Sequence, residues 1–143
     1  MFALHLLVQD VPASIEWYER ALGASLSRLL RLPNGTVAIA DLHVGDLPVA
    51  LAAPIVGTAM AVPNDTSSTV AAFRLTVPNA DLAVTRALDA GAVLVSPTED
   101  KLWGVRSGEV LDPSGHRWGF DQHLRDVPDA DIEAQLAAII ASH

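Results

Sequence analysis

A weak internal repeat constrains the fold of this chain more than any other feature. The strand-like run 3–8 corresponds to the run 72–77, and each run is followed by a turn and a helical pattern. The predicted helices cover 11–22 and 80–90, with Asp10 and Asn79 as their N-caps and Gly23 and Gly91 at their ends. The repeat therefore predicts two copies of the same unit.

Three strand patterns follow each predicted helix, separated by turn residues such as Pro, Asn, Asp and Gly. They cover 25–32, 36–44 and 47–53 in the first unit, and 92–96, 106–111 and 117–123 in the second. The fold class predicted from this order is α+β, with two tandem βαβββ repeats. Repeat one covers about 1–54 and repeat two about 69–123, with a linker over about 55–68.

A final helix is predicted over 129–143. Its apolar stripe consists of Ile132, Leu136, Ile139 and Ile140, and must bury against this chain or against a partner chain. The 143 residues fit a single domain.

Charge and composition exclude several function classes. The chain has 17 acidic and 9 basic residues, so its net charge is −8, and no basic stripe points to nucleic acid or an anionic membrane. This balance favours a neutral or cationic small ligand, although acidity also serves solubility. With no cysteine, disulfides and thiol nucleophiles are excluded. No signal peptide or membrane-spanning run is visible, so a cytoplasmic location is expected.

The alternation of side chains along the predicted strands places polar groups opposite apolar ones. His5 and Arg74 occupy matching strands of the two repeats, Asp41 and His43 share a third strand, and Asp121 lies on the last. Two interpretations stay open: these faces line a ligand cleft, or they are simply exposed to water.

The segment Trp103–Trp118, WGVRSGEVLDPSGHRW, resembles the W-G-x-R-x-G-x-x-x-D-P-x-G-H-x-W signature of the glyoxalase/bleomycin-resistance (vicinal oxygen chelate) superfamily, in its PhnB-like branch. The opening VQDVPASIEWYERALG is similar to the first repeat of that family. The resemblance implies sheets curled into a half-barrel cleft with the helices on the outer face, and a frequent homodimer. Members include metal-dependent lyases, dioxygenases, epimerases, fosfomycin thiol transferases and metal-free proteins that sequester antibiotics.

The resemblance also implies where a metal would bind. The family's ligand positions on the strands fall on Ala3, Ala72 and Gly119, none of which can bind a metal, and 47–53 has no acidic residue or His. We therefore expect no metal and no cofactor. An atypical set of His5, Asp41 and His43 is the alternative, since two His and one carboxylate suit a divalent ion.

Each candidate site residue has a functional and a structural interpretation. His5 either contacts the ligand or is a hydrogen-bonded residue that fills space. His43 either contacts the ligand or is simply exposed to water. Arg74 either recognises the ligand or pairs with an acidic residue such as Asp121. Trp103 stacks on a planar ligand or covers the cleft mouth. Arg106 binds ligand or closes on backbone carbonyls.

The hypothesis that follows is a metal-free small-molecule binding protein, an antibiotic-sequestering one among the possibilities. The alternative is a metal-independent or atypically metallated isomerase or lyase that uses His5 or Asp121 as acid or base. A metal-dependent enzyme ranks third. No nucleophile elbow or phosphate-binding glycine loop is present.

Overall fold

A computed structural model describes residues 2–54, 60–64 and 68–142. The N-terminal module consists of β1 (Leu4–Leu7), α1 (Val11–Leu22), β2 (Ser25–Arg31), β3 (Val37–Val44) and β4 (Leu47–Ala52). The C-terminal module consists of β5 (Phe73–Thr76), α2 (Ala80–Asp89), β6 (Val93–Asp100), β7 (Val105–Leu111) and β8 (Arg117–His123), and α3 (Asp129–Ala141) follows it. The predicted α+β fold with two tandem βαβββ repeats is confirmed.

Each module forms its own four-stranded mixed sheet. The strand orders are β1-β4-β3-β2 and β5-β8-β7-β6, so the first strand of each module pairs in parallel with its last. All other pairs are antiparallel. The identical order explains why the repeat is visible in the sequence.

The helix boundaries follow the sequence signals. Asp10 Oδ1 accepts a hydrogen bond from the Ala13 N–H at 3.0 Å, and Asn79 Oδ1 accepts one from the Leu82 N–H at 3.0 Å. Gly23 ends α1 at a φ of +66°, which favours glycine. The predicted N-caps are confirmed in both repeats, whereas α2 has its C-cap at Ala90, one residue before the predicted Gly91.

Strand β6 is longer than predicted. The sequence pattern stopped at Ser96 because Pro97 and the polar residues after it are typical of a loop. The structure continues the strand to Asp100 after an irregularity in register, with Glu99 opposite Ser107 and Asp100 opposite Arg106. Pairing with β7 therefore overrides the local turn tendency.

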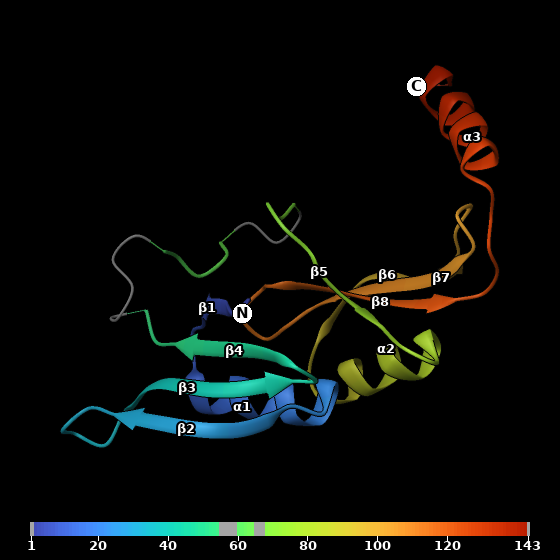
Figure 1. Ribbon diagram of the computed structural model, residues 1–143. Helices are drawn as coiled ribbons and strands as arrows, with labels where there is room; N and C mark the ends of the chain where they lie inside the picture. The colour runs from blue at the N-terminus through green and yellow to red at the C-terminus, as the bar shows by residue number, and fades with distance from the viewer. Residues whose placement is uncertain (1, 55–59, 65–67, 143) are drawn as a thin grey trace.

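The core lies between the sheets and the two helices α1 and α2, which cover one face of each sheet (Figure 1). Trp17, Tyr18, Trp118 and Phe120 are all buried in it. The Trp17 Nε1–H donates to the Ala87 carbonyl oxygen at 3.2 Å, which joins α1 to α2. The modules therefore share one apolar core.

The turn 112–116 fastens the C-terminal module to the N-terminal one. The Tyr18 hydroxyl donates to Asp112 Oδ2 at 2.6 Å, and the His116 ring Nε2 lies 2.7 Å from the Leu7 carbonyl oxygen. Ser114 Oγ accepts from the Gln9 N–H at 2.9 Å. The turn within the WGxRxG…DPxGHxW segment thus has a structural role.

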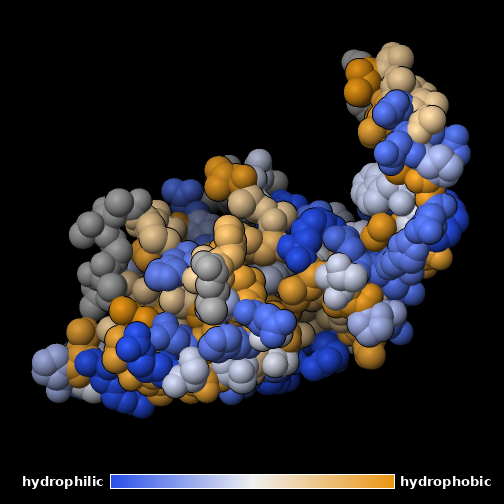
Figure 2. Space-filling view, in the orientation of Figure 1, coloured by the Kyte–Doolittle hydropathy of each residue, from blue (hydrophilic) through white to orange (hydrophobic). Residues whose placement is uncertain are grey.

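The opposite faces of both sheets are not covered by any other described helix or strand (Figure 1). Helix α3 projects away from the body and contacts no described strand or helix (Figure 2). Of the predicted linker, residues 55–59 and 65–67 lie outside the described part. No described helix is long and apolar enough to cross a membrane.

Candidate functional site

Three of the predicted site residues meet on the open face of the N-terminal sheet. Register places His5, Ala50 and Asp41 side by side across β1, β4 and β3, and His43 lies two residues beyond Asp41 on β3. Directly paired residues point to the same face. All three predicted residues line one cavity of about 440 Å³. Residues 36 to 38 positions apart in the chain are therefore gathered by strand pairing alone.

The chemistry of this cavity is polar and accessible. His5 and His43 are exposed, and Asp41 is half-buried. Arg28, which the sequence reasoning missed, donates from Nε to Asp41 Oδ2 at 2.9 Å and also lines the cavity. One carboxylate, one guanidinium and two imidazoles can together bind a ligand that carries both donors and acceptors.

Arg74 and Asp121 form an ion pair on the open face of the C-terminal sheet. Arg74 Nε and Nη2 donate to the two oxygens of Asp121 at 2.8 and 2.7 Å, and Nη2 also donates to Ser107 Oγ at 2.6 Å. Glu109 lies 3.7 Å from Arg74 Nη1 and 3.4 Å from Arg117 Nη1. The charges of these four groups balance one another.

The ion pair fixes the protonation state of Asp121. The hydrogen bonds from Arg74 lower the pKa of Asp121 against the opposing effect of burial, and Ser107 lowers it further. The hydrogen bond to Asp121 raises the pKa of Arg74 in turn. Because a carboxylate held in its ionised form is a weak base and carries no proton near neutral pH, Asp121 is poorly suited to acid–base catalysis.

Arg106 lies on the other side of β7, towards α2. Its Nε donates to Asp81 Oδ2 and its Nη1 to Asp100 Oδ1, each at 2.9 Å. These bonds to carboxylates, not to the backbone carbonyls we expected, hold α2 against the β6–β7 hairpin. Ser107, the next residue on β7, bonds to Arg74, and neighbouring positions on a strand face opposite ways. A ligand-binding role for Arg106 stays a prediction, and it would lie on the face opposite Arg74.

Trp103 lies in the loop between β6 and β7, with 45% of its surface exposed. Val105, which follows the loop, pairs with His123, whereas Arg74 pairs with Gly119. These partners are four residues apart on β8, roughly 13 Å along a strand. Trp103 is therefore available for stacking, but at the end of the sheet.

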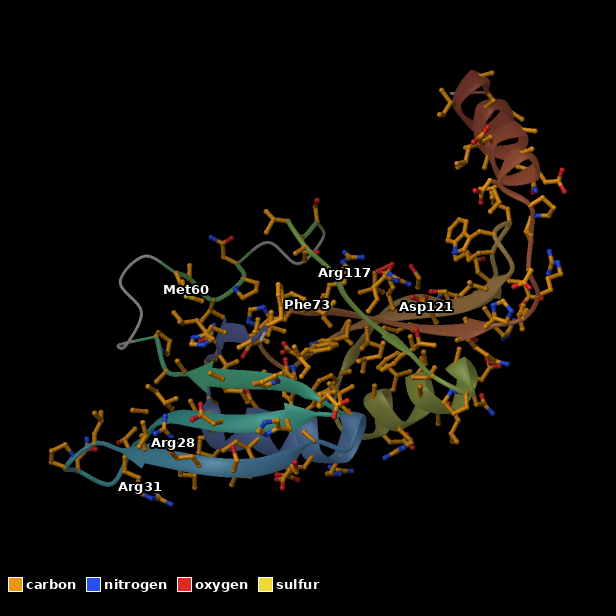
Figure 3. All side chains as sticks on the ribbon, viewed as in Figure 1. Arg28, Arg31, Met60, Phe73, Arg117 and Asp121 are labelled. Carbon is orange, nitrogen blue, oxygen red and sulfur yellow. The ribbon has the colours of Figure 1, made fainter. Side chains whose placement is uncertain are left out.

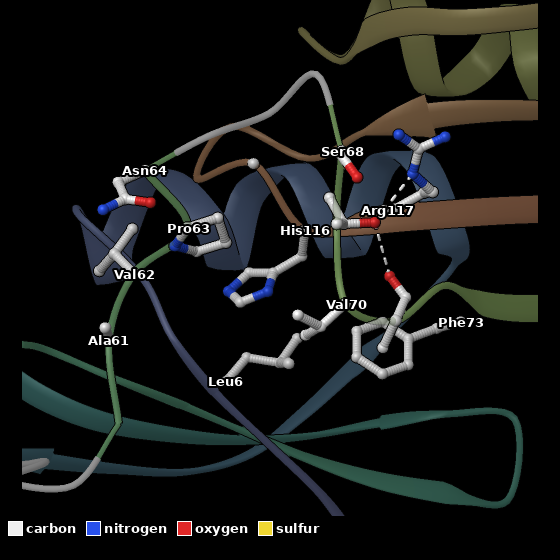
Figure 4. Close-up of a pocket in the computed structure, with 13 residues that line it drawn as sticks. Leu6, Ala61, Val62, Pro63, Asn64, Ser68, Val70, Phe73, His116 and Arg117 are labelled. Carbon is white, nitrogen blue, oxygen red and sulfur yellow. Dashed lines mark hydrogen bonds between the residues drawn. The ribbon is translucent and has the colours of Figure 1, made fainter.

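The polar groups of the two sheets do not converge within one chain. Figure 3 shows Arg28 on the N-terminal sheet and Asp121 on the C-terminal sheet, well separated from each other. A second cavity, which the sequence reasoning missed, lies between the modules under residues 61–64 and 68–71 (Figure 4). No sequence pattern marked it, because this segment was interpreted only as a linker.

Comparison with known proteins identifies the family. A model of the Glyoxalase/Bleomycin resistance protein/Dioxygenase superfamily matches residues 2–120. The chain belongs to this superfamily. An uncharacterized protein of Mycobacterium bovis is 34% identical over 137 residues, which cover 94% of this chain and 90% of that protein.

Solved structures of the superfamily fold resemble the chain over most of its length. TioX from Micromonospora sp. ML1 is 31% identical with a TM-score of 0.66, and the match covers 86% of this chain and 98% of TioX. An Arabidopsis thaliana gene product is 28% identical with a TM-score of 0.69, covering 85% and 97% of the two chains. The fosfomycin resistance protein FosX of Mesorhizobium loti shares the fold alone. It is 16% identical with a TM-score of 0.62, and the match covers 85% of this chain and 90% of FosX.

The residues at the superfamily's metal positions do not fit a metal in this member. A side chain at Gly119 would have to displace the Arg74 guanidinium, since its Cβ would lie 2.6 Å from Arg74 Cζ and 2.7 Å from Nη1. The space that a ligand side chain would need is thus filled by a guanidinium. His5, Asp41 and His43 share a cavity, yet within the described ranges no three His, Asp or Glu side chains are grouped to hold an ion.

Proposed function

We propose that this superfamily member is a metal-free small-molecule binding protein that sequesters a planar organic ligand, for example an antibiotic. The observation that carries the proposal is the cavity of about 440 Å³ that gathers His5, Asp41 and His43 on an open sheet face. Cavities of this size suit small organic molecules. The guanidinium of Arg74 over Gly119 supports binding without a metal.

The complete site, in this proposal, forms between two copies of the chain. Each chain presents two uncovered sheet faces, one with His5 and Asp41 and one with Arg74 and Asp121. A homodimer that places one face opposite the other would enclose a ligand between polar groups from both. Trp103 at the end of the second sheet would then be able to stack on a planar ring.

Overall charge favours a neutral or cationic ligand. The net charge is −8, whereas the ion pairs Arg28–Asp41 and Arg74–Asp121 leave each open face locally balanced. The long-range field therefore attracts cations while the faces themselves tolerate neutral rings.

An isomerase or lyase of the same superfamily is the second candidate. His5, exposed in the cavity, favours it, because an imidazole can serve as a general acid or base. Asp121 is less suited to this role, because its bonds to Arg74 keep its carboxylate ionised.

Metal analysis tests the first part of the proposal. Protein purified without chelator and measured by inductively coupled plasma mass spectrometry is expected to hold far less than one divalent ion per chain. One tightly held ion per chain would overturn the metal-free function and favour the enzyme.

Ligand binding tests the second part. We expect 9-aminoacridine, a planar cation, to raise the melting temperature, and 9-anthracenecarboxylate, a planar anion, to do so less. D41N should weaken acridine binding at least threefold, while the matched control D46N, in the turn between β3 and β4, should not. Equal effects of D41N and D46N would show that the ligand does not bind in this cavity. Unchanged binding in W103A would show that Trp103 does not stack on the ligand.

A further inference from the structure

The cavity between the modules is built differently from the open sheet faces. It has a volume of about 500 Å³ and takes its walls from β1, β5, residues 115–117 at the start of β8, and residues 61–64 and 68–71 between the modules. We propose that it is a second ligand site, which takes a small neutral aromatic molecule with one hydrogen-bond donor, such as a phenol.

The walls are mostly apolar. Leu6, Val62, Pro63, Val70 and Phe73 surround the cavity, as Figure 4 shows. Leu6 and Phe73 belong to the apolar faces of β1 and β5, which also contact the core. A hydrophobic cavity of this size with few polar groups is typical of small-molecule sites.

His116 supplies the polar contact. Its Nε2 lies 2.7 Å from the Leu7 carbonyl oxygen, and because a carbonyl only accepts, Nε2 carries the hydrogen. In the neutral ring Nδ1 is then an acceptor. No described residue donates to Nδ1, and the ring lies among Leu6, Pro63 and Val70 (Figure 4). A ligand hydroxyl or N–H can therefore donate to it.

The charge next to the cavity is compensated, which favours a neutral ligand. Arg117 donates from Nε to Thr69 Oγ1 at 2.9 Å, and its Nη1 lies 3.4 Å from Glu109 Oε2. Figure 4 shows its guanidinium turned away from His116, so its stem forms the wall. Thr69 also donates to the Ala71 carbonyl oxygen at 2.9 Å, which orders this side of the cavity.

This site is separate from the proposed sheet-face site. His5 and Arg74 alternate with Leu6 and Phe73 along their strands and point to the opposite side. None of the residues that line the cavity of His5, Asp41 and His43 lines this one. Binding at one cavity can therefore be measured and removed without the other.

Two matched probes test the hydrogen bond. 2-Naphthol carries a donor, whereas 2-methoxynaphthalene has the same rings without one. In titrations followed by calorimetry on the whole chain, we expect one molecule of 2-naphthol per chain and methoxynaphthalene binding about three- to tenfold weaker. No binding of 2-naphthol at millimolar concentration, or equal affinity for the two probes, would overturn the site as proposed.

Variants locate the binding. V62W fills the cavity from a segment outside all strands and helices, and should abolish binding of both probes with an unchanged melting temperature. H116F should reduce 2-naphthol to the affinity of the methoxy compound, and the matched control H43F, in the other cavity, should change neither. H116F also removes the bond to Leu7. If H116F does not fold, the result with V62W decides the test. Binding that survives V62W but is lost in H43F would place the probe on the open sheet face and refute this site.

Discussion

Tyr18 shows how much one buried hydroxyl contributes to joining the modules. It donates to Asp112 Oδ2 at 2.6 Å and accepts from the Trp118 indole N–H at 3.1 Å. Both Tyr18 and Trp118 are almost fully buried. Helix α1 of one repeat and the turn before β8 of the other are thus connected by a single polar group within the core.

The titration of this tyrosine gives a direct prediction, since the chain has only one. Burial first, then the negative charge of Asp112 and the hydrogen bond to it, raise the pKa of Tyr18 well above its ordinary value. Absorbance at 295 nm should show no phenolate in the folded protein until well above pH 10, with Y18F as the blank. Ionisation near pH 10 without unfolding would contradict this.

The sign of the stability effect follows from the same shift. Because the unfolded chain loses the Tyr18 proton at lower pH than the folded chain, the unfolded state binds fewer protons above about pH 10. The neutral hydroxyl therefore contributes fully to the free energy of unfolding below about pH 10, and this contribution is lost as the pH rises further. Denaturant unfolding at several alkaline pH values should show a steeper loss in the parent than in Y18F.

Gly119 leaves room for the guanidinium of Arg74. A Cβ there would lie 2.6–2.8 Å from three guanidinium atoms, so G119A should displace the guanidinium from Asp121. We expect the pKa of Asp121, followed by NMR, to rise towards its ordinary value, with a stability loss of about 1 kcal/mol or less because the pair is partly exposed. In an R74M background G119A should no longer change that pKa, and a persistent change would show another cause.

At the scale of elements, the two repeats begin their helices in the same way. Asp10 and Asn79 each accept one N–H from the first turn at 3.0 Å. D10A and N79A should each lower the free energy of unfolding by about 1 kcal/mol, measured by urea denaturation. D10N, which keeps the acceptor, is the control and should cost much less, and an equal loss in D10N would assign the effect to charge.

At the scale of the whole molecule, α3 and the open sheet faces lack a covering layer in the described chain. Leu136 and Ile140 of the predicted stripe are 42% and 73% exposed, and α3 has no buried residue. A helix of 13 residues is marginal by itself in water. We therefore expect the stripe to pack against a partner chain, one of the two possibilities that the sequence left open.

This arrangement predicts a homodimer. Light scattering after gel filtration should give twice the chain mass of 15.1 kDa. L136D, which puts a charge on the stripe, should weaken the dimer, whereas A134D, on the opposite side of α3, should not. A monomer at tens of micromolar would contradict the prediction, and equal effects of the two variants would exclude the stripe from the interface.

The sequence by itself determined the elements, their order and their buried faces. Caps such as Asp10, the glycine after α1 and the alternation in β1 and β8 act over a few residues, so they can be recognised without knowing the fold. The absence of ligand side chains at Ala3, Ala72 and Gly119 was also visible there, through the family resemblance.

Only the tertiary structure decided which groups meet. Strand register placed His5 and Asp41 on either side of Ala50, the close approach of Arg74 filled the space over Gly119, and the long β6 brought Asp100 to Arg106. The cavity around His116 depends on how the two modules and their connection pack. Such contacts join residues far apart in the chain, and their geometry depends on the packing of whole elements, which no local pattern encodes.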